Sequence, residues 1–212
     1  MGAVPRVERP APVVRQTAGM RHICVYCGSN PGSSHAFART AEALGARLAG
    51  EGFGVVYGGG RVGLMGTLAD AALAAGTEVI GVIPRQLAER EVAHLGLTEL
   101  VVVESMHQRK AVMADRASGF IALPGGYGTL DEVLEILTWN QIGAIAKPVA
   151  FLDVGGYFDS LFRFFDDAVH AGLLMPMHRA MAQRVDDVGE AVDVAGGFAP
   201  PSPGKWTDPS VR

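Results

Sequence analysis

The sequence has little charge of either sign and no long hydrophobic run. Charged residues make up 19% of its 212 residues, and the formal net charge is -4. A disordered chain would carry more charge and fewer apolar residues than the 49% present here, so the composition argues against that class. A nucleic-acid-binding domain would need a basic face, which this charge balance disfavours. No apolar stretch approaches the roughly 20 residues that a membrane-spanning helix requires.

Cysteine is nearly absent, with only Cys24 and Cys27. Their CxxC spacing can indicate a redox or zinc site, but it lies in a β-strand pattern, in which side chains three positions apart point to opposite faces. No second cysteine pair completes a zinc site. We therefore expect two reduced thiols in the core. Residues 1–20 also lack the apolar segment of a secretory signal, and we expect a cytoplasmic protein that binds neither membranes nor nucleic acid.

Apolar, β-branched runs alternate with helical patterns along most of the chain. Strands are predicted at 22–27, 53–57, 78–83, 99–103, 120–123 and 148–152, with a weaker one at 184–185, and helices at 34–50, 64–75, 106–117, 130–142 and 158–171. This alternation is typical of parallel βαβ units. We expect one α/β domain over residues 21–195, with a doubly wound parallel sheet in a three-layer sandwich. Residues 1–20 are predicted to form a flexible arm, and the Pro/Gly-rich residues 196–212 a disordered tail.

Glycine is in excess, with 28 residues against the roughly 7% of an average protein. Many of these glycines gather where predicted strands pass into helices, in segments 27–29, 58–66 and 124–129. The carboxyl ends of parallel strands share one edge, where open α/β sheets bind ligands. Glycine lets backbone N–H groups approach an anion closely, and a helix N-terminus favours negative charge. The sequence therefore predicts a phosphate site; the alternative for any single loop is a tight turn or close helix packing.

Two known phosphate-binding patterns fit this sequence poorly. Gly58, Gly60 and Gly63 have the spacing of the dinucleotide fingerprint, but they follow the second predicted strand instead of the first. The acid about 20 residues further on is Glu78, which begins the next strand, whereas a ribose-binding acid belongs at its carboxyl end. This position disfavours a pyridine-nucleotide oxidoreductase. No Lys-Ser/Thr pair follows the glycines of segment 124–129, so that segment is not a P-loop.

Ionisable residues stand at two predicted helix starts. Thr129 and Glu132 have capping-box spacing, so a helix cap is the alternative to a functional role for Glu132. Arg109 and Lys110 lie in a first helical turn, where cations oppose the helix dipole at roughly 0.3–1 kcal/mol each. A local rule that is broken without compensation points to function. The alternative for these two residues is a solvated helix start.

These segments resemble a known family. Residues 123–132, LPGGYGTLDE, resemble the PGGxGTxxE signature of the LONELY GUY (LOG) family, and residues 105–110, SMHQRK, are similar to its MHxRK segment. The resemblance covers roughly residues 21–195 and leaves both ends of the chain outside. It implies a Rossmann-like homodimer without metal or cofactor. It also implies hydrolysis of the N-glycosidic bond of cytokinin riboside 5′-monophosphates, and of AMP, to the free base and ribose 5-phosphate.

The resemblance also implies roles for individual residues. Arg109 and Glu132 match the catalytic Arg and Glu of the family, and a carboxylate suits the oxocarbenium character that develops during glycosidic cleavage. The implied substrate-binding residues are Glu91, Lys110, Gly125, Gly126, Tyr127, Gly128, Thr129, Leu130, Asp131 and Thr138. By themselves, Glu91 fits a solvated surface acid and Thr138 fits a packing residue.

Two other functions are alternatives to the hydrolase. Some LOG members have been named lysine decarboxylases, but that chemistry needs a Schiff-base lysine for pyridoxal phosphate. The available lysines, Lys110, Lys147 and Lys205, have no evident partner for the pyridinium nitrogen. A non-catalytic carrier of a nucleotide or cofactor could use the same glycine loops, because fold alone does not settle function. Such a carrier would not need Arg109 and Glu132 together.

Overall fold

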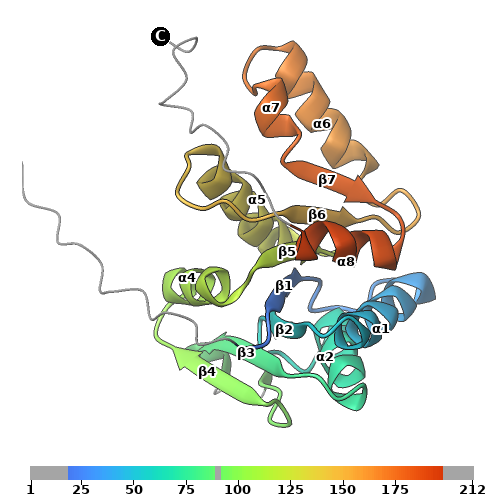
Figure 1. Cartoon of the computed structure of the whole chain (residues 1–212), viewed down its shortest axis with the longest axis vertical. Coiled ribbons are helices and arrows are strands. Elements are labelled where there is room, and N and C mark those ends of the chain that lie inside the picture. Colours follow the sequence, from blue (N-terminus) through green and yellow to red (C-terminus); the bar gives the residue numbers. More distant parts are fainter. Residues whose placement is uncertain (1–18, 89–91, 198–212) are drawn as a thin grey trace, which may run out of the picture.

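One parallel sheet forms the centre of the computed structural model, which describes residues 19–88 and 92–197 (Figure 1). Its strands are β1 (His22–Tyr26), β2 (Gly54–Tyr57), β3 (Val79–Pro84), β4 (Glu99–Val103), β5 (Gly119–Ala122), β6 (Val149–Leu152) and β7 (Ala182–Val185). The order across the sheet is β4-β3-β2-β1-β5-β6-β7, and every neighbouring pair is parallel. The chain thus winds outward from β1 to β4, returns to β5 and winds outward again. The predicted doubly wound parallel sheet is confirmed.

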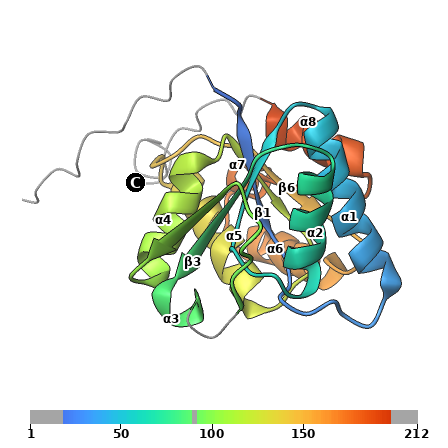
Figure 2. The same ribbon diagram turned by 90° about the horizontal axis from the view of Figure 1, so that it is seen from below.

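Helices cover both faces of this sheet (Figure 2). One face packs against α1 (His35–Gly50), α2 (Gly63–Ala74) and α8 (Val188–Gly196), and the other packs against α4 (Met106–Arg116), α5 (Tyr127–Gln141) and α6 (Asp159–His170). The described part of the chain also contains the short helices α3 (Arg85–Leu87) and α7 (Pro176–Arg179). The predicted Rossmann-like three-layer sandwich is therefore confirmed. None of the helices in the described part of the chain is long and apolar enough to cross a membrane.

The β1 side chains alternate between the two cores, as a strand buried on both faces requires. Cys24 belongs to the core under α4, α5 and α6, whereas Cys27, just after β1, belongs to the core under α1, α2 and α8. Both cysteines are free, and burial raises the pKa of each thiol. The CxxC spacing therefore forms no joint site, and the prediction of two core thiols is confirmed.

Among the helices of eight or more residues, α5 and α8 differ from the sequence prediction by more than one residue. Helix α8 was not expected, although Asp187 accepts a hydrogen bond from Glu190 N at 3.0 Å and so caps it. Its nine residues are too few to give a clear helical period. Helix α5 begins at Tyr127, three positions before the expected start at residue 130, because the glycine-rich turn itself forms the first helical turn.

Tyr57 has a fully buried side chain whose hydroxyl finds no hydrogen-bond partner among the described residues. A buried polar group without a partner costs roughly 1–3 kcal/mol. We therefore expect Tyr57→Phe to increase the free energy of unfolding by about 1 kcal/mol and to raise the Tm by roughly 2–4 °C. Thermal and urea unfolding would measure this change. A lower Tm in the variant would show that the hydroxyl is satisfied in solution.

Candidate functional site

A cavity of about 800 Å³ lies at the carboxyl ends of the strands, where the winding of the sheet reverses between β1 and β5. Open α/β sheets bind ligands at this reversal. The glycine-rich loops after β1, β2 and β5 all contribute to its walls, through Gly28, Gly58, Gly60, Gly125, Gly126 and Gly128. The predicted convergence of the three glycine loops on one edge is thus confirmed.

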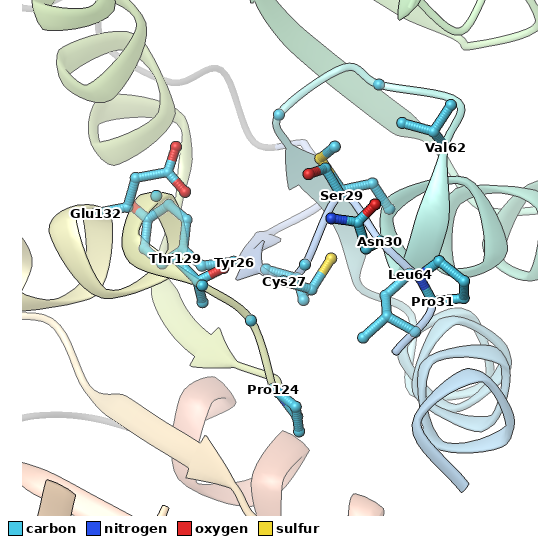
Figure 3. A pocket seen from close by; sticks show the side chains of 18 of the residues that line it. Tyr26, Cys27, Ser29, Asn30, Pro31, Val62, Leu64, Pro124, Thr129 and Glu132 are labelled. Atoms are coloured by element: carbon cyan, nitrogen blue, oxygen red, sulfur yellow. The ribbon is translucent and has the colours of Figure 1, made fainter. Parts of the chain in front are cut away.

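Figure 3 shows the two sides of this cavity. Glu132 and Thr129 lie on α5 at one side, and Val62 and Leu64 lie at the start of α2 on the other. Asn30, from the loop that follows β1, lies between them. Polar groups on α5 therefore face a largely apolar wall, an arrangement that suits a ligand with one ionic end.

The N-terminus of α5 is open to this cavity. Gly126 is the N-cap residue, and no side chain caps the helix. A Cβ atom on Gly126 or Gly128 would meet no other atom within 4 Å, whereas one on Gly125 would collide with Thr129 Oγ1. The first N–H groups of a helix have no intrahelical partner, and they carry the positive end of the dipole. This turn can therefore bind an anion such as a phosphate.

Glu132 does not cap α5. Because the helix starts at Tyr127, Glu132 lies in its second turn, and the capping-box alternative is wrong. Its side chain is only 8% exposed, and its Oε1 lies 2.7 Å from Nη1 of Arg109. Oε1 has no aligned hydrogen-bond donor among the described residues, despite this close ion pair. Oε1 is itself buried, and the Arg109 guanidinium is the charged group that lies against it.

Arg109 reaches the cavity from the first turn of α4. Its Nε donates a hydrogen bond to the carbonyl of Val82 at 3.0 Å, and its side chain is 11% exposed. The guanidinium passes so close to Gly58 that a Cβ atom there would collide with Nη2. The alternative of a solvated helix start is therefore wrong for Arg109, and the glycine after β2 is needed to admit this side chain.

Burial raises the pKa of Glu132 above its ordinary value. The positive charge of Arg109 opposes this effect, and the neighbouring carboxylate of Asp131 adds to it. The pKa of this carboxyl group is therefore determined mainly by desolvation, which raises it, and by the charge of Arg109, which lowers it.

Arg109→Gln should raise the pKa of Glu132 further, because the substitution removes the main contribution that lowers it. Titration of the labelled Glu132 carboxyl carbon by NMR would measure the change. Lys110→Gln is the comparison, and its effect should be in the same direction but smaller, since Lys110 lowers this pKa less than Arg109 does. An unchanged pKa in Arg109→Gln would contradict this account of the pair.

Lys110 and Asp131 lie beside the cavity and not in its wall. Lys110 Nζ bridges two carboxylates of α5, at 3.2 Å from Asp131 Oδ2 and 3.1 Å from Glu135 Oε2. Burial lowers the pKa of Lys110, but its hydrogen bonds to the two carboxylates outweigh this and leave the pKa raised. The alternative of a solvated helix start is therefore wrong for Lys110 as well. These ion pairs link α4 to α5.

The other predicted substrate-binding residues are distributed unevenly. Tyr127 lines the cavity and is 94% exposed, whereas Leu130 packs into the core beneath α5. Thr138 is exposed and donates to the Leu134 carbonyl at 2.8 Å, in a small groove away from this cavity. Within one chain, neither Leu130 nor Thr138 reaches the site. Glu91 lies outside the described residues.

Part of the cavity wall was not predicted from the sequence. Phe37 of α1 and Tyr157 of the loop between β6 and α6 both line the cavity, with their rings in edge contact at a centroid distance of 5.7 Å. The available signal was a fourth glycine-containing segment after a predicted strand, with Gly155 and Gly156 at φ angles of 66° and 78°. Such a turn at the carboxyl edge brings the residue after it toward the site.

The chain matches a family model and several named relatives. A family model described as "Possible lysine decarboxylase" matches residues 65–194. Cytokinin riboside 5′-monophosphate phosphoribohydrolase LOG7 of Arabidopsis thaliana is 46% identical over 172 residues, which cover 81% of this chain and 79% of the relative. The LOG3 enzyme of the same plant is 43% identical over 185 residues, covering 87% and 86%.

Solved structures of lower sequence identity share the fold. A molybdenum cofactor binding protein from Rippkaea orientalis has a TM-score of 0.63 at 20% identity, covering 84% of this chain and 96% of that one. The molybdenum cofactor carrier protein of Chlamydomonas reinhardtii has a TM-score of 0.63 at 23% identity, covering 82% and 94%. At these identities the similarity shows a common fold alone.

The two described lysines do not fit a pyridoxal phosphate enzyme at this cavity. Lys110 is held by two carboxylates, and Lys147 Nζ donates to the Ala114 carbonyl at 2.7 Å. Burial lowers the pKa of Lys147, but neither lysine lines the cavity. Lys205 lies outside the described residues. Over residues 19–88 and 92–197, no group of three or more His, Cys, Asp or Glu side chains is placed to hold a metal ion.

Proposed function

The chain belongs to the LONELY GUY (LOG) family of cytokinin riboside 5′-monophosphate phosphoribohydrolases, and from that premise we propose that it hydrolyses the N-glycosidic bond of these nucleotides and of AMP. The products are the free base and ribose 5-phosphate. The observation that carries the proposal is the buried Arg109–Glu132 pair, with its Nη1–Oε1 distance of 2.7 Å, in the same cavity as the open N-terminus of α5.

The substrate phosphate would bind at the first turn of α5. Gly125, Gly126, Gly128 and the Thr129 hydroxyl surround this turn, and unpaired N–H groups with the helix dipole favour an anion there. Since Glu132 lies one turn further along the same helix, a bound ribose 5-phosphate would extend from the phosphate toward its carboxylate. Helix α5 thus positions both the phosphate and the reacting carbon.

The reaction breaks the bond between C1′ of the ribose and the base nitrogen. The electron pair stays with the base, a water oxygen bonds to C1′, and the proton released from water is taken up by the departing base. Positive charge develops on the ribose as the bond lengthens, and the ionised Glu132 carboxylate stabilises it. Arg109 holds Glu132 in position and donates hydrogen bonds to the substrate from its planar guanidinium group.

We further propose that the enzyme is a cytoplasmic homodimer with a single catalytic domain over residues 21–195. Met106 and Tyr127 are large apolar side chains on α4 and α5 that are 44% and 94% exposed, and a second copy could cover them. Light scattering of the purified protein measures its oligomeric state.

Chromatography of reaction mixtures tests the proposed activity directly. The purified protein is incubated with AMP and with isopentenyladenosine 5′-monophosphate, and free base and ribose 5-phosphate are quantified. We expect equal amounts of the two products from at least the isopentenyl substrate. Tight nucleotide binding without release of base from either substrate would overturn the proposal and favour the non-catalytic carrier.

A further inference from the structure

Tyr157 contacts the phosphate-binding turn directly. Its hydroxyl donates a hydrogen bond to the Gly125 carbonyl at 2.7 Å, and its ring lines the cavity beside Phe37. The contact joins the loop after β6 to the loop after β5 across 32 positions of sequence. No motif in the sequence predicts it, and the hydrolysis mechanism above does not use it.

The loop that carries Tyr157 is itself firmly held. Asp153, which is 5% exposed, accepts a hydrogen bond from Phe158 N at 3.0 Å and so closes the turn around Tyr157. Arg184 of β7 lies 2.5 Å from Asp153 Oδ2 and 2.6 Å from Asp159 Oδ1. Ion pairs on both sides of Tyr157 therefore hold the loop from which its side chain extends.

The hydrogen bond to Gly125 sets the direction of a backbone donor. In a trans peptide the carbonyl and the following N–H point in opposite directions, so holding the Gly125 carbonyl also orients the N–H of Gly126, the N-cap residue of α5. The preceding peptide is fixed in the same way, because Gly28 N donates to the Pro124 carbonyl at 3.1 Å. Two consecutive peptides of the glycine turn are thus aligned from opposite sides, one by the loop after β1 and one by Tyr157.

We propose that Tyr157 is a positioning residue for phosphate binding, which acts by fixing the Gly125–Gly126 peptide. This role rests on the proposed function only in the identity of the ligand, a nucleoside 5′-monophosphate. Without the hydroxyl, the glycine turn can rotate, and its N–H groups no longer converge on the phosphate. Affinity for the phosphate-bearing part of the ligand falls, while the base-binding part of the cavity is unaffected.

The test compares Tyr157→Phe with Tyr57→Phe, which removes a hydroxyl from the core outside the cavity wall. Calorimetry measures the binding of ribose 5-phosphate and of free adenine, and steady-state kinetics measure KM and kcat for the isopentenyl nucleotide. In Tyr157→Phe we expect Kd for ribose 5-phosphate and KM to rise about threefold to tenfold, the worth of one hydrogen bond. Adenine binding and kcat should stay within twofold, and Tyr57→Phe should change none of these values.

Two results would overturn this role. Unchanged ribose 5-phosphate binding in Tyr157→Phe would show that the hydroxyl does not set the turn. Equal weakening of ribose 5-phosphate and adenine would indicate a general disturbance of the cavity. The binding measurements need no turnover, so wild-type protein that binds ribose 5-phosphate but releases no base would contradict the proposed function and leave the role of Tyr157 testable on the same samples.

Discussion

We expect Glu132→Gln to lower kcat for base release by about 10³-fold, while the Kd for the nucleotide stays within severalfold of the wild-type value. Glutamine preserves the shape of the side chain but removes the negative charge that, in the mechanism we propose, faces the reacting ribose. A preorganised charge of this kind, in a site shielded from water, typically contributes two to four orders of magnitude in rate. Because Glu132 is only 8% exposed, water cannot readily replace it. Single-turnover assays and equilibrium binding would separate the two effects.

Glu99→Gln is the matched control for this substitution. Glu99 also pairs with an arginine, Arg116 at 3.0 Å, but both side chains are 45% exposed and lie outside the cavity wall. The kcat of the Glu99→Gln variant should remain within twofold of the wild-type value. A Glu132→Gln enzyme that retains more than a tenth of wild-type kcat would show that the carboxylate is not the catalytic group.

We expect Arg109→Ala to lower kcat/KM by roughly 10²–10³-fold and also to destabilise the fold. The activity should fall because the variant loses the cation that is paired with Glu132 and that we propose orients the substrate. The stability falls because Glu132 is left buried without its partner, and breaking a buried ion pair typically costs about 3–5 kcal/mol. Kinetic assays and urea unfolding would measure the two losses on the same preparation.

The loss of stability in Arg109→Ala should depend on pH. Burial holds the folded-state pKa of Glu132 above its ordinary value, and removal of Arg109 raises it further. A raised folded-state pKa means that the stability is fully present below the unfolded-state pKa and is lost as the pH rises through the folded-state pKa. The difference in free energy of unfolding between wild type and variant should therefore be smaller near pH 5 than near pH 8.

Arg116→Ala controls for the loss of an arginine at a surface ion pair. Its cost should not exceed about 1 kcal/mol, because exposed pairs contribute little. An Arg109→Ala variant as stable and as active as Arg116→Ala would contradict both the buried pair and its catalytic role.

The sequence was sufficient to predict the parallel sheet, the edge of the sheet that carries the cavity, and the importance of Arg109. Alternating strand and helix patterns predicted the sheet, and glycines at three strand ends predicted one binding edge. Arg109 could be singled out because a cation at a helix start is unfavourable without a nearby partner, and that partner is Glu132.

Two kinds of feature could not be predicted in this way. The first is the early start of α5: glycines that favour a loop in the sequence adopt helical backbone angles in the structure. The second is contact between distant segments. Tyr157 reaches Gly125 only because β5 and β6 are neighbours in the sheet and both loops emerge at one edge. The placement of Lys110 between two carboxylates similarly depends on α4 and α5 lying together over one face.

The bridge from Lys110 to Asp131 and Glu135 has a consequence for the catalytic cycle. It joins the two helices that carry Arg109 and Glu132, so the spacing of that pair is determined when the protein folds and not when substrate arrives. Substrate binding then does not have to bring the charged groups together, because the entropic cost of aligning them is part of folding. The empty enzyme, the substrate complex and the product complex should accordingly share one arrangement of these two side chains, and turnover should proceed without closure of one helix on the other.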